Sequence, residues 1–202
     1  MHRPTLTSFL FVTIALLPGL AETARAQQTA PQGPPTAQTS VPVPRTQAAA
    51  PVAGVRNFTR VDATFACGGA LSADAVSSLA QAGFKSIVNI RTAGEPDANI
   101  EAHAQAAKAA GLTYIHLPFA SASPDATKVD EFLKAVADPG NQPMLLHCAG
   151  GVRASMFWAI KRVMIDGWTV DKALAELPDL SKNISPGLRA FMLDYLKQHG
   201  RL

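Results

Sequence analysis

Residues 144–165 read MLLHCAGGVRASMFWAIKRVMI, and this stretch decides the fold of the chain. The short apolar run MLLH is typical of a buried strand. Cys148 and a glycine pair follow, and residues 152–165 then carry apolar side chains at helical spacing. We therefore predict a strand over residues 144–147, a tight loop that begins at Cys148, and a helix that leaves the loop.

The loop has the residue types of an anion cradle. Glycines let backbone N–H groups converge, and the start of a helix adds partial positive charge. The same field favours a thiolate at Cys148, which would be the nucleophile. Arg153 could hold two oxygens of the anion and stabilise charge in the transition state. His147 could hydrogen-bond locally and orient the loop. The phosphate-binding segment would comprise Ala149, Gly150, Gly151, Val152 and Arg153.

An inert, buried Cys148 is the alternative, because a lone cysteine after an apolar strand is more often a packing residue. The histidine before Cys148, the glycines after it and the arginine at the mouth of the helix favour the functional interpretation.

The rest of the folded part alternates short apolar runs with helical stretches. Ser72 is the expected cap of the first helix and Gly83 its end. Together these segments predict a single α/β domain over residues 56–202, with a mainly parallel central sheet of four to five strands flanked by helices. In such sheets ligands bind beyond the carboxyl ends of the strands, where the Cys148 loop lies. The expected strands span 61–66, 85–90, 113–117 and 144–147, and the expected helices begin near 72, 101, 124, 152, 168 and 186.

Residues 1–26 have the layout of a secretory signal peptide. His2 and Arg3 precede an apolar stretch over residues 6–20, and Ala24-Arg25-Ala26 supplies a cleavage site. The stretch is short for a membrane span, which needs about 20 apolar residues. We expect a periplasmic or secreted protein without stable membrane insertion, and an uncleaved N-terminal anchor is the alternative.

Residues 27–55 are rich in Pro, Ala and Gln, with almost no charge and no aromatic side chain. Such a composition cannot bury enough apolar surface to fold, so we predict a disordered linker.

The net charge of +3 gives no case for nucleic-acid binding, since Lys and Arg are scattered rather than clustered. His103 and His116 have no partners at metal-ligand spacing, so no metal is expected.

Five motifs occur in a specific order: CGG at 67–69, IVNIR at 87–91 with Glu95, YIHLP at 114–118, HCAGGVR at 147–153 and GWT at 167–169. In these motifs the chain resembles the bacterial dual-specificity and tyrosine-phosphatase-like domains of the beta-lactamase-hydrolase-like phosphatase family. The resemblance implies a cysteine-phosphatase-like fold and hydrolysis of phosphate monoesters through a cysteinyl-phosphate intermediate, without metal or other cofactor. The substrate would be a phosphorylated protein or small molecule.

The chain departs from the tyrosine-phosphatase pattern at the loop and at the general acid. Four residues separate Cys148 from Arg153, where the familiar loop has five. The familiar loop then has Ser or Thr, whereas here Ala154 follows Arg153 and Ser155 comes one place later. Ser155 could assist breakdown of the intermediate or only face the helix. The superfamily places an acidic residue on the loop over residues 118–125, where Asp125 is the one acid. Asp125 would be the general acid, or a first-turn residue that complements the helix dipole.

Arg91 and Glu95 are expected to form a structural pair at the end of a strand. In the resembled fold the turn after the first strand lies beside the active site, so Cys67 could form a reversible, protective disulfide with Cys148. A small apolar packing residue is the alternative for Cys67.

Two other functions stay open at this point. A rhodanese-like sulfurtransferase would carry a persulfide on Cys148, and its loops share the spacing of four residues. A catalytically inactive module that binds anions or phosphopeptides is the second alternative, favoured by Ala154 and the weak case for Asp125.

Overall fold

The computed structural model describes residues 50–180 and 184–202. The predicted signal peptide and the linker up to residue 49 lie outside the described residues. In the described part, no helix is both long and apolar enough to cross a membrane.

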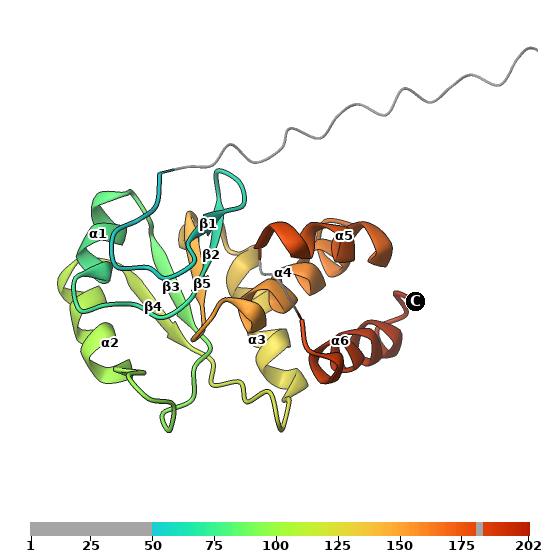
Figure 1. Ribbon diagram of the computed structural model, residues 1–202. Helices are drawn as coiled ribbons and strands as arrows, with labels where there is room; N and C mark the ends of the chain where they lie inside the picture. The colour runs from blue at the N-terminus through green and yellow to red at the C-terminus, as the bar shows by residue number, and fades with distance from the viewer. Residues whose placement is uncertain (1–49, 181–183) are drawn as a thin grey trace, which may run out of the picture. The chain divides into compact units, whose positions relative to one another are not determined.

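A five-stranded sheet forms the centre of the domain (Figure 1). Its strand order is β1-β2-β5-β3-β4. The β1–β2 pair is antiparallel, and the three other pairs are parallel. This confirms the expected mainly parallel sheet and places β5, which leads into the Cys148 loop, at its centre. The strands are β1 (Thr59–Arg60), β2 (Phe65–Gly68), β3 (Ser86–Asn89), β4 (Thr113–His116) and β5 (Met144–His147).

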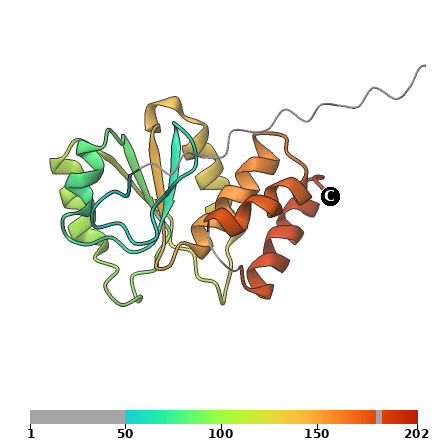
Figure 2. The same cartoon turned by 45° about the horizontal axis from the view of Figure 1, so that its top comes forward.

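Helices cover both faces of the sheet (Figures 1 and 2). One face carries α1 and α2, and the other carries α3 and α4, with α5 and α6 packed on α4. The predicted helices are all present within a few residues of their expected bounds. They are α1 (Ala75–Gln81), α2 (Ile100–Ala109), α3 (Ala126–Ala137), α4 (Val152–Met164), α5 (Val170–Leu180) and α6 (Pro186–Gln198), with a short 3-10 turn at Pro139–Asn141.

The two faces have separate cores. Between the sheet and α1–α2 the core contains Phe84, Ile87 and Leu145. The larger core contains Phe65 from β2 and Trp158 from α4, whose rings stack with centroids 4.1 Å apart. Burial of each such side chain contributes about 1.5–3 kcal/mol. The larger core therefore fixes α4, the helix that carries Arg153, against the sheet.

Three expected boundaries are wrong. The strand expected over residues 61–66 begins instead at Phe65, because Asp62 Oδ1 accepts hydrogen bonds from the backbone N–H and the hydroxyl of Thr64 and forms the turn between β1 and β2. The first helix begins at Ala75 with Asp74 as its N-cap, not at Ser72. Val52 and Val55, assigned to the end of the linker, are buried against the α1–α2 core, so the ordered chain begins earlier than residue 56.

Candidate active site

Cys148 is the first residue beyond the central strand. Its backbone N–H donates to Gly68 O on β2 at 3.2 Å, which continues the parallel ladder by one bond. The side chain is 1% exposed. The backbone N–H of Gly151, the N-cap of α4, donates to Cys148 Sγ at 3.1 Å. A donor at the N-terminus of a helix stabilises a thiolate, so the predicted nucleophile lies where its charge is favoured.

The turn from the loop into α4 requires glycine at Gly151, whose φ is +100°. The loop also lies close to β2 and the residues that follow it: a Cβ atom at Gly69 would meet Ala149 O at 2.9 Å. The backbone N–H of Ala70 donates to that same oxygen at 2.9 Å. The CGG motif therefore supports the loop from outside, and a side chain at Gly69 would displace it.

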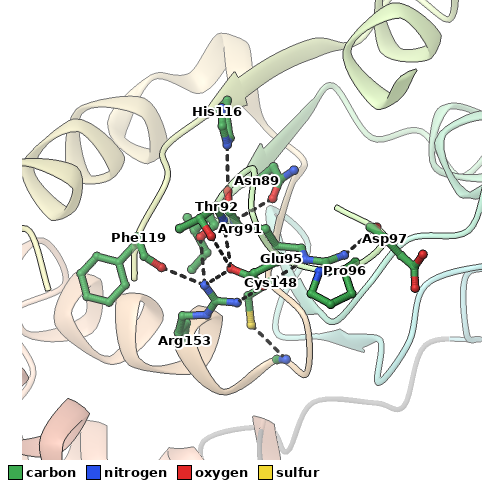
Figure 3. A network of polar contacts seen from close by, with 12 residues as sticks. Asn89, Arg91, Thr92, Glu95, Pro96, Asp97, His116, Phe119, Cys148 and Arg153 are labelled. Carbon is green, nitrogen blue, oxygen red and sulfur yellow. Dashed lines mark hydrogen bonds and ion pairs between the residues drawn. The ribbon is translucent and has the colours of Figure 1, made fainter. Parts of the chain in front are cut away.

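Arg153, in the first turn of α4, is held by Glu95 (Figure 3). Its Nη1 donates to Glu95 Oε1 at 2.6 Å and its Nη2 to Glu95 Oε2 at 2.7 Å. Nη1 also donates to Phe119 O at 2.8 Å. A bidentate arginine–carboxylate pair fixes the plane of the guanidinium as well as its position.

This arrangement determines which donors of Arg153 are left for an anion. A guanidinium has five N–H groups. Glu95, Phe119 and Ile90 accept from Nη1, and Glu95 accepts from one N–H group of Nη2, which leaves Nε–H and the second N–H of Nη2. These two groups lie parallel on one edge of the guanidinium and can bind two oxygens of a phosphate. Arg153 also forms a side-chain hydrogen bond with Cys148.

The charges at the site reinforce one another. Burial opposes the charge on Arg153, but Glu95 and Cys148 outweigh it and raise the pKa of Arg153. Burial likewise opposes the charge on Glu95, but hydrogen bonds from Arg153 and from the Thr92 backbone lower the pKa of Glu95 to about 2. Both groups therefore stay charged at neutral pH.

The expected Arg91–Glu95 pair is present, with Nε and Oε2 3.2 Å apart. Arg91 is buried, and its other nitrogens donate to the carbonyl oxygens of Pro96 and Asp97. Glu95 thus connects two arginines, and Arg91 fixes the loop that carries the carboxylate to Arg153.

His147 lies on the face of the sheet covered by α2, where its ring contacts the ring of His103 edge-on at 6.5 Å. Its ring lies against the backbone of Cys148 and Gly69, the local contacts expected of it, although neither ring nitrogen makes a hydrogen bond of ordinary geometry among the described residues. Burial, and then repulsion by His103, lowers the pKa of His147 to about 3. The ring is therefore neutral and contributes no positive charge to the thiolate.

Ser155 and Asp125 both use their side chains locally. The Ser155 hydroxyl donates to Gly151 O at 3.0 Å, which leaves it no proton for the sulfur in this conformation. Asp125 is the N-cap of α3, and its Oδ1 accepts from the backbone N–H of Thr127 at 2.9 Å and from the Thr127 hydroxyl at 2.7 Å. These bonds lower the pKa of Asp125, which disfavours the protonated form that a general acid needs.

Cys67 and Cys148 are both free and buried. The register pairs Cys67 with Leu146, so Cys148 lies two residues farther along the neighbouring strand on the same face. Strand spacing and rise place two such Cα atoms about 8 Å apart, beyond the span of an unstrained disulfide. Burial, and then the charge of Cys148, raises the pKa of Cys67 well above its ordinary value. The proposed disulfide stays a prediction and would require β2 to move.

In the described part of the chain, no group of three or more His, Cys, Asp or Glu side chains could hold a metal ion. Around Cys148 the structure places the backbone N–H of Gly151 and the guanidinium of Arg153, and both are donors that suit an anion.

A thiol at the N-terminus of a helix, at the carboxyl end of a parallel strand and beside a fixed arginine, defines a cysteine-dependent phosphatase site. Similarity to known proteins identifies the family within this class. The family described as "DSP-PTPase phosphatase fused to NAD+ Kinase" matches residues 46–185, and the chain belongs to this family. The resemblance inferred from the sequence motifs is thereby confirmed.

Two curated relatives are the beta-lactamase hydrolase-like proteins of Xylella fastidiosa strains Temecula1 and 9a5c, each 32% identical over 109 residues. Each match covers 53% of this chain and 25% of the relative. The chain therefore spans about a quarter of the length of these relatives.

Solved structures share the fold. A DUF442 protein of Shewanella putrefaciens CN-32 matches with a TM-score of 0.61 and 20% identity, over 72% of this chain and 94% of its own. The core catalytic domain of the PP-IP phosphatase SIW14 of S. cerevisiae matches with a TM-score of 0.60 and 18% identity, over 75% of this chain and 98% of its own. P. aeruginosa TpbA in complex with pTyr matches with a TM-score of 0.60 and 19% identity, over 78% of this chain and 97% of its own.

The bidentate contact between Glu95 and Arg153 was not predicted from the sequence. The two residues are 58 positions apart, and only the adjacency of β3 and β5 brings them together. A usable signal existed: an acidic side chain just after a buried strand lies near the site whenever that strand neighbours the one that carries the nucleophile.

Proposed function

We propose that the protein hydrolyses phosphate monoesters through a cysteinyl-phosphate intermediate on Cys148. The observation that carries this proposal is that Cys148 Sγ, 3.1 Å from the Gly151 N–H, also lies beside an arginine that Glu95 binds by its other edge. Membership of a phosphatase family supports it.

In the first step, the Cys148 thiolate attacks the phosphorus atom and forms an S–P bond while the P–O bond to the leaving group breaks. Arg153 binds two of the phosphoryl oxygens, and the N–H groups of the loop stabilise the charge that develops. The leaving oxygen takes its proton from water, since the Asp125 carboxylate is held in its charged form by Thr127. This route favours aryl phosphates, which release a weakly basic oxygen.

In the second step, water attacks the phosphorus atom and the S–P bond breaks. Cys148 leaves as the thiolate, and the proton lost by water balances the hydroxide formed when water protonated the first leaving group. The products are an alcohol or phenol and inorganic phosphate.

The proposed substrate class follows from a mechanism in which no side chain acts as general acid. We propose a phosphorylated protein or small molecule with an aryl ester, such as phosphotyrosine. TpbA, which shares this fold, has been solved in complex with pTyr. SIW14, which also shares this fold, is a PP-IP phosphatase.

The assay uses the purified protein with p-nitrophenyl phosphate, phosphotyrosine peptide and phosphoserine peptide, each beside Cys148→Ser. We expect phosphate release from the two aryl esters, much slower release from phosphoserine, and none from the variant. Release that persists in Cys148→Ser would refute the mechanism. Transfer of sulfur from thiosulfate to cyanide, measured in the same preparations, would favour the sulfurtransferase alternative, and phosphate binding without turnover would favour the inactive module.

We also propose that the protein acts in the periplasm or is secreted, on the basis of the signal-peptide pattern in residues 1–26. Expression with a C-terminal tag, cell fractionation and N-terminal sequencing test this. A mature chain that begins at Gln27 in the soluble envelope or extracellular fraction is expected. A chain that retains Met1 in the membrane fraction would instead support an uncleaved anchor.

A further inference from the structure

The carbonyl oxygens of the Cys148 loop are held from outside by residues near β1 and β2. Ala149 O accepts from the backbone N–H of Ala70 at 2.9 Å. Gly150 O accepts from Asn57 Nδ2, also at 2.9 Å, across 93 positions of sequence. Asn57 is thus the side chain that reaches the loop from the segment before the first strand.

The bond from Asn57 fixes more than one atom. A peptide unit is planar, and its C=O and N–H groups point in opposite directions. The unit that joins Gly150 to Gly151 has its oxygen bonded to Asn57 and its N–H bonded to Cys148 Sγ at 3.1 Å. One rigid plane therefore connects the Asn57 amide to the sulfur of the nucleophile.

The chain on either side of this plane offers little resistance to rotation. Both flanking residues are glycine, and a Cβ atom at Gly150 would meet no other atom within 4 Å. Glycine populates positive and negative φ about equally. Among the described residues, no second donor reaches Gly150 O. If the plane turned over, a carbonyl oxygen rather than an N–H would face the sulfur and any bound phosphate.

Asn57 itself is well fixed. Its φ is +49°, a left-handed value that asparagine tolerates better than most residues. The residue before it is held on both sides, since the backbone N–H of Arg56 donates to Ala70 O and Arg56 O accepts from the Gly69 N–H. The Asn57 amide is therefore presented to the loop from a rigid backbone.

We propose that Asn57 is a positioning residue that keeps the Gly151 N–H turned toward Cys148, and thereby sets both the stability of the thiolate and the affinity of the loop for phosphate. This proposal rests on the proposed function, because it assumes that Cys148 and its loop bind the phosphoryl group.

The test compares Asn57→Gly with a matched control, Asn99→Gly. Glycine accepts the left-handed backbone at both positions and removes the side chain. Asn99 has a φ of +46° and makes no side-chain capping bond, so its loss removes no comparable contact. Three quantities are measured: the pH midpoint of iodoacetamide alkylation at Cys148, located by peptide mapping; the dissociation constant for inorganic phosphate, by calorimetry; and kcat and KM for p-nitrophenyl phosphate.

In Asn57→Gly we expect the alkylation midpoint to rise by about one pH unit, which is a tenfold change in the thiol–thiolate equilibrium. Phosphate affinity and kcat should each fall about tenfold, while Asn99→Gly matches the wild type. Asn57→Asp, which keeps the size of the side chain but cannot donate, should shift the midpoint at least as far and serves if the glycine variant is unstable.

An alkylation midpoint and a phosphate affinity that are unchanged in both Asn57 variants would overturn the proposal. Failure of the proposed function has a different signature: the wild type would release no phosphate from any ester, whereas the alkylation midpoint would still report on the effect of Asn57.

Discussion

Glu95 performs two tasks with one carboxylate. It neutralises part of the charge of two arginines, and it fixes the guanidinium of Arg153 so that one edge faces the site. Without it, Arg153 would sample several rotamers, and binding of phosphate would have to restrict them again. The value of Glu95 therefore lies in the orientation of Arg153 before the substrate arrives.

Replacement of Glu95 by Gln should lower kcat/KM by about 10- to 100-fold, because an amide cannot accept from both Arg153 nitrogens and its NH2 group repels one of them. Steady-state kinetics with p-nitrophenyl phosphate measure the effect. Glu101→Gln, an exposed change of the same kind on α2, is the control and should leave kcat/KM unaltered. Wild-type kinetics in Glu95→Gln would show that Arg153 is oriented by other contacts.

Single residues also show what the sequence could and could not predict. The Cys148–Arg153 loop was predicted because all its parts are contiguous. The His147 side chain points to the face of the sheet covered by α2, because neighbouring residues of a strand point to opposite faces, and its orienting role stays a prediction. The contacts of Glu95 and Asn57 with the loop span 58 and 93 positions, and no local pattern encodes them.

At the level of elements, α3 begins with a capping interaction that competes with the catalytic role expected of Asp125. One carboxylate oxygen satisfies the backbone N–H and the hydroxyl of Thr127 at the start of the helix. A cap favours the ionised carboxylate, whereas a general acid must deliver a proton. The two roles therefore make opposite demands on the same side chain.

Asp125→Ser separates these roles, because serine is a good N-cap but has no carboxyl group. We expect the serine variant to keep both stability and kcat, and Asp125→Ala to lower the unfolding free energy with little change in kcat. Urea unfolding and kinetics with an alkyl phosphate measure the two effects. A fall in kcat of about 100-fold or more in both variants would restore Asp125 as the general acid.

The boundaries of helices were predicted well where the helical periodicity extends over several turns. Boundaries were predicted poorly where side chains form hydrogen bonds with the backbone. Asp62 turns the chain within the strand expected over residues 61–66, and a turn of this kind competes directly with strand pairing. The sequence pattern could predict parallel strands, but their order depends on pairings between distant segments.

For the whole molecule, the buried histidine pair makes stability depend on pH. Burial lowers the pKa values of His103 and His147, the latter to about 3, while an unfolded chain takes up these protons near pH 6.5. The folded state thus binds fewer protons than the unfolded state between these values. Stability is fully present above pH 6.5 and falls as the pH drops through this window.

Between pH 7 and pH 5 we expect His147 alone to cost about 2 kcal/mol of unfolding free energy. Urea unfolding at pH 7, 6 and 5 measures the slope. His147→Leu removes the titrating group without leaving a buried polar atom unpaired, and should flatten the curve. Equal slopes in the wild type and His147→Leu would contradict the assignment.

Because β5 lies at the centre of the sheet, we expect it to be the segment most protected from hydrogen exchange. Its four residues are fully buried and are bonded to β2 on one side and β3 on the other. Amide protons of Leu145 and Leu146 can then exchange with deuterium only when the whole domain opens, so their exchange rates should report the global unfolding free energy. Nuclear magnetic resonance measures them residue by residue. The nucleophile is thus anchored to the slowest-exchanging segment of the chain, and loosening of distant surface elements should leave its position undisturbed.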